Sequence, residues 1–266
     1  MKKITALIPC YNEAEGIGDV IRKLPAQKLR TYGYELDVLV MDNNSTDNTS
    51  EVARKAGARV VLEKKQGKGN AIRTGFYNLA DDTDYVVMLD GDDTYRAEEV
   101  LRLIEPLDSG FADAILGSRM HGHISDGSMP RFNRFGNKLY STLVRGAYGI
   151  PVTDVLTGYY AWTTESVKQL RPHLRSTDFA IEMEMVTKMA RLGHRVYSVP
   201  ISYDSRQGDS SLNPLRDGYR ILRMYIRNLA WQPNIQAPTV PVVEALHEES
   251  TTSNEQKQKS TDSNRI

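Results

Sequence analysis

The first 118 residues alternate short apolar runs with amphipathic segments, and this alternation constrains the fold more than any other feature. The apolar runs lie at residues 4–8, 36–41, 59–62, 85–89 and 112–116, and helical patterns separate them at residues 14–24, 47–56, 70–79 and 97–107. Strands of a parallel sheet are buried on both faces and joined by helices, so they are apolar nearly throughout. We therefore predict an α/β fold with a mostly parallel central sheet and helices on both faces.

Polar clusters follow four of the predicted strands. They are residues 9–13, 42–47, 90–93 and 117–119. In α/β sheets of this kind, ligands bind in the crevice outside the carboxyl ends of the strands. The functional site is therefore expected among these four clusters.

The tripeptide Asp90-Gly91-Asp92 has the most direct chemical interpretation of these clusters. Gly91 allows a close backbone turn, so the two flanking carboxylates can converge on one point. Neighbouring carboxylates repel each other unless a cation intervenes, and hard oxygen ligands suit Mg²⁺ or Mn²⁺. Asp-Gly is also common in turns, so a turn or helix cap ahead of residues 97–107 is the alternative.

Three further polar residues have both a functional and a structural interpretation. Asp42 could accept hydrogen bonds from a base or ribose, or it could form an Asx turn or helix cap. Glu13 could face a ligand, or it could be an acid of a first helical turn. Lys68 lies in a Gly/Lys loop that opens a helix, where it could approach an anion or remain solvated. The glycine spacing of this loop excludes a Walker A motif.

The net charge of zero is a sum of unlike parts. Residues 1–118 carry 15 basic and 20 acidic side chains, residues 119–234 carry 16 and 9, and residues 235–266 carry 3 and 5. The neutral total argues against a protein that mainly coats nucleic acid. The acidic first part suits a bound cation, whereas the basic middle part suits an anionic partner.

Taken together, the motifs resemble those of family 2 glycosyltransferases with the GT-A fold. The resemblance rests on Ile8-Pro9-Cys10-Tyr11-Asn12-Glu13, the Asp42–Asp47 cluster, Gly67-Lys68-Gly69, Asp90-Gly91-Asp92 and Gly117-Ser118-Arg119, in this order. Farther along, residues 154–159 and 203–212 resemble the polyprenyl (dolichyl) phosphate sugar synthase branch of that family. The similarity spans residues 4–230. Asn43 departs from the pattern, because a second acid is frequent at this position, and residues 157–159 are Thr-Gly-Tyr where Ser-Gly-Phe is familiar.

This resemblance implies a metal-dependent, inverting transfer of a sugar from a nucleotide-diphosphate sugar to a polyprenyl phosphate. By position, the donor nucleotide would be bound by Pro9, Tyr11, Glu13, Asp42, Lys68, Asp90 and Gly91. Asp90 and Asp92 would hold Mg²⁺ or Mn²⁺, and Arg119 would approach the phosphates. A UDP-sugar is favoured over a GDP-sugar, although Asn43 leaves the base specificity open.

Direct displacement at the anomeric carbon is the expected reaction, with Asp92, Arg119 and Asp154 as candidate catalytic residues. A phosphate acceptor is already anionic at pH 7 and needs no general base. A hydroxyl acceptor needs a carboxylate base, for which Asp154 is the first candidate and Glu182 and Glu184 are the next.

Three other functions are compatible with parts of the pattern. A soluble glycosyltransferase would act on a hydroxyl of a polysaccharide, a protein or a small molecule. A non-catalytic module would bind a nucleotide sugar without turning it over. A sugar nucleotidyltransferase would show a glycine-rich phosphate loop after the first strand, where residues 9–13 stand instead.

The basic part of the chain carries the candidate ligands for an acceptor phosphate, Arg131, Arg134 and Arg206. It also contains a predicted amphipathic helix over residues 214–231, whose arginines recur at helical spacing at Arg216, Arg220, Arg223 and Arg227. Such a helix could lie on an anionic membrane surface, or it could be an ordinary surface helix with a solvated arginine face.

Residues 1–234 are expected to form the catalytic domain, with a donor and metal half at 1–118 and an acceptor half at 119–234. Residues 235–266 are predicted to be a disordered polar tail, because residues 247–266 contain one apolar side chain, at the last position. Cys10 is the single cysteine, which excludes an internal disulfide and a multi-cysteine zinc site. A surface loop is favoured over a metal pair for His121-Gly122-His123.

The location of the protein is also predicted from what the sequence lacks. No apolar run approaches the roughly 18 residues of a membrane-spanning helix. The amino-terminal apolar stretch is too short for a secretory signal peptide. We therefore expect a cytoplasmic protein, peripheral at the cytoplasmic face of a membrane.

Overall fold

The computed structural model describes residues 1–205 and 214–233. Met1–Pro233 form one compact unit. The tail predicted for residues 235–266 lies outside the described residues, as does Arg206.

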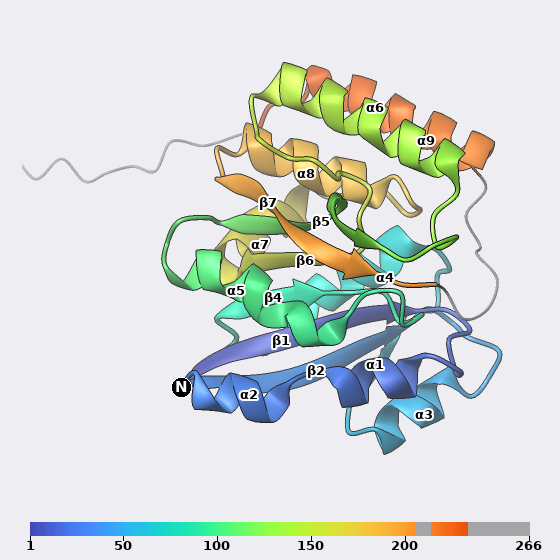
Figure 1. The fold of residues 1–266 in the computed structure, drawn as a ribbon, viewed down its shortest axis with the longest axis vertical. Helices are drawn as coiled ribbons and strands as arrows, with labels where there is room; N and C mark the ends of the chain where they lie inside the picture. The colour runs from blue at the N-terminus through green and yellow to red at the C-terminus, as the bar shows by residue number, and fades with distance from the viewer. Residues whose placement is uncertain (206–213, 234–266) are drawn as a thin grey trace, which may run out of the picture. The chain divides into compact units, whose positions relative to one another are not determined.

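The described residues contain one seven-stranded sheet with the order β3-β2-β1-β4-β6-β5-β7 (Figure 1). Its strands are β1 (Lys2–Cys10), β2 (Tyr34–Asp42), β3 (Arg59–Leu62), β4 (Tyr85–Met88), β5 (Ala114–Ile124), β6 (Tyr160–Thr163) and β7 (Val196–Tyr203). All neighbouring pairs are parallel except those of β6, which runs antiparallel to β4 and β5. The mostly parallel α/β sheet expected from the sequence is therefore confirmed.

Helices cover both faces of this sheet, as expected, and bury the strands between them. They are α1 (Ile17–Lys23), α2 (Ala26–Thr31), α3 (Thr49–Lys55), α4 (Lys68–Tyr77), α5 (Val100–Asp108), α6 (Arg131–Tyr148), α7 (Thr164–Leu170), α8 (Ile181–Arg191) and α9 (Pro214–Leu229), with the short 3₁₀ turns η1 (Ala97–Glu99) and η2 (Arg171–His173). One hydrophobic core contains side chains of α1, α2 and α5, and a second contains side chains of α4, α7 and α8.

Strand β1 shows why its sequence lacks apolar–polar alternation. Ile4, Ala6 and Ile8 belong to one core, whereas Leu7 belongs to the other. Successive side chains of a strand point to opposite faces, so a strand covered on both faces is apolar at most positions, and Thr5 is the polar exception among the buried residues of β1. Each fully buried Ile or Leu contributes about 1.5–3 kcal/mol relative to an exposed one.

Two local expectations are wrong. Strand β5 continues to Ile124, so Gly117-Ser118-Arg119 lies within the strand rather than after it, and His121 and His123 lie on an exposed stretch of strand rather than in a loop. The second half of β5 pairs with β7 beyond an irregularity between Ser118 and His123. It is mainly solvent-exposed, so its sequence is as polar as that of a loop.

Helix α2 was not expected either, because it is short and buries Leu29 alone.

Helices α6 and α9 lie side by side and pack on α8 (Figure 1). The Tyr140 hydroxyl of α6 donates a hydrogen bond to the Gly218 carbonyl of α9 at 2.8 Å. Helix α6 ends at Tyr148 because Gly149 takes the left-handed conformation, with φ of 68°. Over residues 1–205 and 214–233, none of the helices combines the length and the apolar character needed to cross a bilayer.

Candidate active site

A pocket of about 480 Å³ opens at the carboxyl ends of β1 and β4. Its lining comes from segments that are far apart in the sequence: Pro9, Cys10, Tyr11, Glu13, Asn43, Gln66, Gly67, Lys68, Ala71, Asp90, Gly91, Asp92, Thr177, Asp178, Phe179, Arg216 and Arg220. A volume of this size accommodates a nucleotide-sized ligand. The position agrees with the rule that α/β sheets bind ligands beyond their carboxyl ends.

Most of the residues predicted to bind a donor nucleotide line this pocket. They are Pro9, Tyr11, Glu13, Lys68, Asp90 and Gly91, and the predicted metal ligand Asp92 lines it as well. Asp42 does not line it. Its buried carboxylate accepts hydrogen bonds from the Ser45 N–H, at 2.8 Å, and from the Ser50 hydroxyl, so it shapes the turn after β2.

Asn43 lines the pocket in place of Asp42 and organises the loop before α4. Its amide donates to the carbonyls of Glu63 and Lys65, at 3.2 and 2.8 Å, and its Oδ1 accepts from the Gly67 N–H at 2.6 Å. An aspartate could not donate the first two bonds, because a carboxylate only accepts. The departure at this position therefore has a structural consequence that the sequence pattern does not reveal.

The glycines on either side of Lys68 allow a close approach of another backbone segment. A Cβ on Gly67 would lie 2.1 Å from the Thr177 carbonyl oxygen, and one on Gly69 would lie 2.4 Å from that of Ser176. Gly67 also has a φ of 126°, which favours glycine. The Gly-Lys-Gly motif thus lets residues 176–177 pack against the start of α4 and delivers Lys68 into the pocket.

Lys68 lies between two carboxylates. Its ammonium is 2.8 Å from Asp90 Oδ1 and 2.8 Å from Glu182 Oε1. Burial lowers the pKa of Lys68, but the charges of Asp90 and Glu182 outweigh burial and leave the pKa raised. For Glu182, an acid, burial has the opposite effect and raises the pKa, and the positive charge of Lys68 opposes this shift. Glu182, considered above as a base, is therefore the ion-pair partner of a pocket lysine.

Asp90 and Asp92 fit a divalent cation. Their oxygens are hard ligands, and the ammonium already held by Asp90 shows that this position attracts positive charge. Asp92 is buried, and its Oδ1 accepts from the Thr94 hydroxyl at 2.7 Å. No cluster of three or more His, Cys, Asp or Glu side chains suited to a metal occurs among the described residues. Two carboxylates match Mg²⁺, which usually completes its shell with substrate phosphates and water.

Arg119 and Asp154 form a buried, bidentate ion pair that does not line the pocket. Arg119 Nε donates to Asp154 Oδ2 and Arg119 Nη2 donates to Oδ1, both at 2.8 Å, and the Arg119 backbone N–H also donates to Oδ2 at 2.9 Å. Asn137 donates to Oδ1 as well. The four acceptor positions of the Asp154 carboxylate are thus filled, which leaves none for a substrate proton.

Arg131, Arg134 and Glu184 are also absent from the pocket lining. Arg131 and Arg134 are exposed on the first turn of α6. Glu184 is buried and accepts the N–H groups of Arg175 and Ser176, and it pairs with Lys188 at 2.6 Å. Its contacts therefore hold the segment before α8 in place.

Sequence reasoning missed two basic residues of the pocket. Arg216 and Arg220, on the first turns of α9, line it together with Asp178. Arg220 Nη1 lies 3.3 Å from Asp178 Oδ2. Their helical spacing placed them on one face of α9, but nothing local indicated that this face reaches the strand ends.

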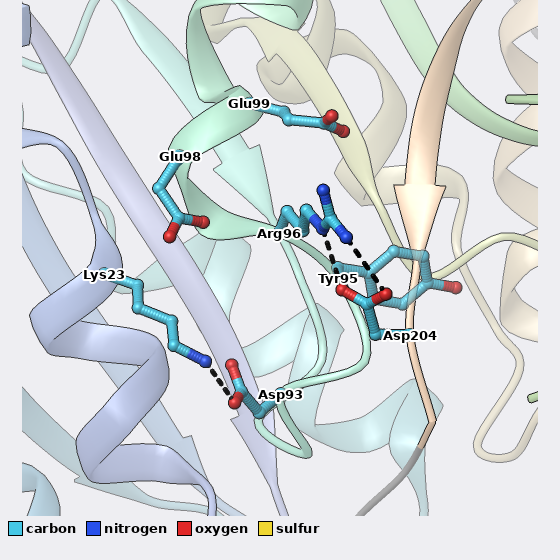
Figure 2. A pocket seen from close by; sticks show the side chains of 7 residues that line it. All are labelled: Lys23, Asp93, Tyr95, Arg96, Glu98, Glu99 and Asp204. Atoms are coloured by element: carbon cyan, nitrogen blue, oxygen red, sulfur yellow. Dashed lines mark hydrogen bonds and ion pairs between the residues drawn. The ribbon is translucent and has the colours of Figure 1, made fainter. Parts of the chain in front are cut away.

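A second cavity of about 460 Å³ lies next to the loop that follows Asp92 (Figure 2). Figure 2 shows Arg96 directed at Asp204 and Lys23 at Asp93. The Arg96 Nε is 2.8 Å from Asp204 Oδ2, and the Asp204 N–H donates to the Thr94 carbonyl at 2.8 Å. The cavity therefore marks where the end of β7 is joined to the loop that carries Asp92.

The family model for glycosyl transferase family 2 matches residues 5–170. The chain belongs to this family. It is thus a glycosyltransferase, and the family resemblance of the strand-end motifs is confirmed.

Two curated relatives and one solved structure illustrate the similarity. Glycosyltransferase AglJ of Haloferax volcanii is 39% identical over 227 residues, which cover 84% of this chain and 71% of that protein. The dolichyl-phosphate hexose transferase of the same organism is 30% identical over 226 residues, covering 84% of this chain and 92% of that protein. Glucosyl-3-phosphoglycerate synthase of Mycobacterium tuberculosis, crystallised with Mn²⁺, UDP-glucose and phosphoglyceric acid, shares the fold with a TM-score of 0.67 at 21% identity, covering 88% of this chain and 81% of that one. The GT-A fold expected from the motifs is therefore confirmed.

Proposed function

We propose that this glycosyltransferase transfers a sugar from a nucleotide-diphosphate sugar to a polyprenyl phosphate, with inversion at the anomeric carbon. The pocket carries the proposal, because it joins the carboxylates Asp90 and Asp92 to the cations Lys68, Arg216 and Arg220. A metal ion and positive side chains both offset the negative charge that two phosphorylated substrates bring together. The name of the dolichyl-phosphate hexose transferase, which the chain matches over most of its length, supports the acceptor class.

The donor nucleotide is proposed to bind along the end of β1, at Pro9, Tyr11 and Glu13, with Gly91 beside it. UDP is favoured over GDP. Mg²⁺ or Mn²⁺ held by Asp90 and Asp92 would neutralise charge on the leaving diphosphate. Lys68 adds a positive charge in the same pocket.

A phosphate acceptor agrees with the side chains around the pocket. An acceptor phosphate oxygen forms the bond to the anomeric carbon while the bond from that carbon to the diphosphate oxygen breaks. The acceptor is ionised at pH 7, so no protein base is required. This matters because Asp154 is bound by Arg119 and Asn137, and Glu182 is paired with Lys68. A hydroxyl acceptor would need a carboxylate base, and the three carboxylates predicted for that role, Asp154, Glu182 and Glu184, are each paired with an Arg or Lys.

Arg119 is proposed to act through its position rather than as the first contact with phosphate, because it is buried against Asp154. Arg131, Arg134 and Arg206 remain predicted ligands for an acceptor phosphate. Arg131 and Arg134 start an amphipathic helix that exposes Phe132, Phe135 and Leu139. Basic and aromatic side chains on one exposed helix suit an anionic membrane surface, where a polyprenyl phosphate resides.

The test uses the whole chain with a polyprenyl phosphate, a panel of labelled nucleotide sugars, and Mg²⁺ or Mn²⁺. Organic extraction is expected to recover labelled lipid with at least one UDP-sugar. Label that stays in the aqueous phase on a hydroxyl acceptor would identify a soluble glycosyltransferase instead. Donor binding without release of nucleoside diphosphate would identify a non-catalytic module.

A matched pair of variants tests the metal assignment. Asp92→Asn is expected to lower the affinity for Mn²⁺ and to abolish transfer. Asp93→Asn is the control, because Asp93 lies in the second cavity against Lys23 and its positive φ of 59° is tolerated by asparagine. Calorimetric Mn²⁺ binding that is equal in both variants would contradict the role of Asp92.

A further inference from the structure

The ion-pair cluster of Lys68, Asp90 and Glu182 joins three elements next to the pocket. Lys68 begins α4, Asp90 follows β4, and Glu182 lies in the first turn of α8. The Lys68 ammonium is 2.8 Å from an oxygen of each acid. The side chains of Lys68 and Glu182 are 15% and 7% exposed, so water and salt screen these charges weakly. A change of charge at one member therefore acts strongly on the other two.

The two acids differ in how much they depend on Lys68. Glu182 is buried, and among residues 1–205 and 214–233 Lys68 is its one ion-pair partner. A buried charge that loses its partner is strongly destabilising. Asp90, in contrast, is a proposed ligand of a divalent ion, whose charge can replace that of the ammonium. Lys68 is thus indispensable to Glu182 and replaceable at Asp90.

The Asp90 carboxylate has little room to move. The Gly158 backbone lies so close that a Cβ there would be 2.2 Å from Asp90 Oδ2. Lys68, however, carries its ammonium on a flexible stem of four carbons. An ammonium and a divalent ion on one carboxylate are like charges a few ångströms apart, and they repel each other strongly at low dielectric. The ammonium is therefore the group that gives way.

We propose that Lys68 competes with the divalent ion for Asp90 and withdraws toward Glu182 when that ion binds. This inference rests on the proposed function, in which Asp90 and Asp92 hold the ion. Mn²⁺ alone then binds weakly, because the ammonium must be displaced. A diphosphate offers the withdrawn ammonium new acceptor oxygens, so UDP and Mn²⁺ bind better together than apart. If Lys68 merely supported the two acids, its removal would loosen the site and weaken Mn²⁺ binding instead.

The experiment measures Mn²⁺ binding to Lys68→Met by calorimetry, first without nucleotide and then with UDP. Without nucleotide, its Kd for Mn²⁺ is expected to fall about tenfold or more, because the competing charge is gone. The factor by which UDP tightens Mn²⁺ binding is expected to shrink. Lys64→Met is the matched control, because it removes the same charge from an exposed position in the same loop, and it is expected to bind Mn²⁺ like the parent.

Glu182 is tested by changing it alone and together with Lys68. Glu182→Gln leaves the ammonium to Asp90, so it is expected to weaken Mn²⁺ binding about threefold or more. Lys68→Met/Glu182→Gln removes both charges and is expected to bind Mn²⁺ more tightly than the parent. This double variant also serves if Lys68→Met is too unstable to fold, which thermal unfolding without metal shows.

The sign of these changes decides the proposal. Unchanged or weaker Mn²⁺ binding when Lys68 is replaced would overturn it, and so would an equal gain in Lys64→Met. Tighter Mn²⁺ binding by Glu182→Gln would overturn the role of Glu182. If the variants behave as expected but the parent makes no glycosylated lipid, the proposed acceptor fails and this inference stands. If the parent makes that lipid but Lys68→Met shows no gain in Mn²⁺ affinity, this inference alone fails.

Discussion

Asp90 is held in place from two sides. Lys68 pairs with its Oδ1, and the backbone of Gly158 approaches its Oδ2 so closely that a Cβ on Gly158 would lie 2.2 Å away. A carboxylate fixed in this way is ready to bind a cation without reorganising. Gly158 belongs to the Thr-Gly-Tyr sequence singled out above, so the structure supplies a physical reason for glycine there.

Gly158→Ala is therefore expected to displace the Asp90 carboxylate. We expect Mn²⁺ affinity and transfer to fall about tenfold or more, with a stability loss of about 1–3 kcal/mol from overpacking. Calorimetry and thermal unfolding measure the two effects. Gly146→Ala on α6 is the control, because no atom lies within 4 Å of its added Cβ, and it should be neutral or slightly stabilising. Parent-like Mn²⁺ binding by Gly158→Ala would contradict this account of Asp90.

The elements of the second half depend on long-range connections. The start of β7 is joined to β5 by Arg195, whose Nη2 lies 2.8 Å from Asp113 Oδ1 and whose backbone N–H donates to Asp113 Oδ2 at 2.8 Å. The hydrogen bond from Arg195 lowers the pKa of Asp113 below its usual value, and burial opposes this shift.

A lowered pKa in the folded protein means that the pair stabilises the fold above the unfolded pKa of about 3.9. This stability is lost as the pH falls through the lower, folded pKa. Asp113→Asn is expected to cost about 0.5–1 kcal/mol at pH 7, discounted because Arg195 is half exposed, and less at pH 3. Urea unfolding at the two pH values measures the difference. Asp82→Asn, which breaks a more exposed pair with Lys3, is the control. A cost that does not shrink at pH 3 would contradict the linkage.

On the scale of the whole compact unit, the pocket is connected to the outer helices α6 and α9. Helix α9 contributes to the pocket through Arg216 and packs against α6, which exposes Phe132 and Phe135. A membrane that meets these helices would bring a lipid phosphate close to the pocket mouth. The geometry thus couples the proposed membrane contact to the proposed acceptor.

Phe132→Ser/Phe135→Ser is accordingly expected to weaken binding to vesicles of mixed neutral and anionic lipid. Burying one Phe contributes about 1.5–3 kcal/mol, so a loss of at least tenfold is expected in a flotation or sedimentation assay. The control is Phe111→Ser, whose side chain is 56% exposed but packs on Tyr197, away from α6. Equal binding by both variants and the parent would exclude this membrane contact.

Several features were predictable from sequence because they depend on local pattern. The apolar runs predicted β1, β2, β3 and β4, since a short continuous apolar run is visible within a single segment of the sequence. The polar clusters at their ends predicted pocket residues such as Glu13 and Asp90. The polar half of β5 was not predicted, because a solvent-facing strand paired on one edge has the composition of a loop.

The sequence by itself determined the α/β class, the family and the clustering of Pro9, Lys68 and Asp90 at one edge of the sheet, because chain order and strand direction bring these ends together. Only the tertiary structure decided which charges neutralise one another. Lys68 meets Glu182, Arg119 meets Asp154, and Arg220 meets Asp178 through packing of segments far apart in the chain. Such pairings depend on helix placement to within a few ångströms, a distance that local sequence patterns do not encode.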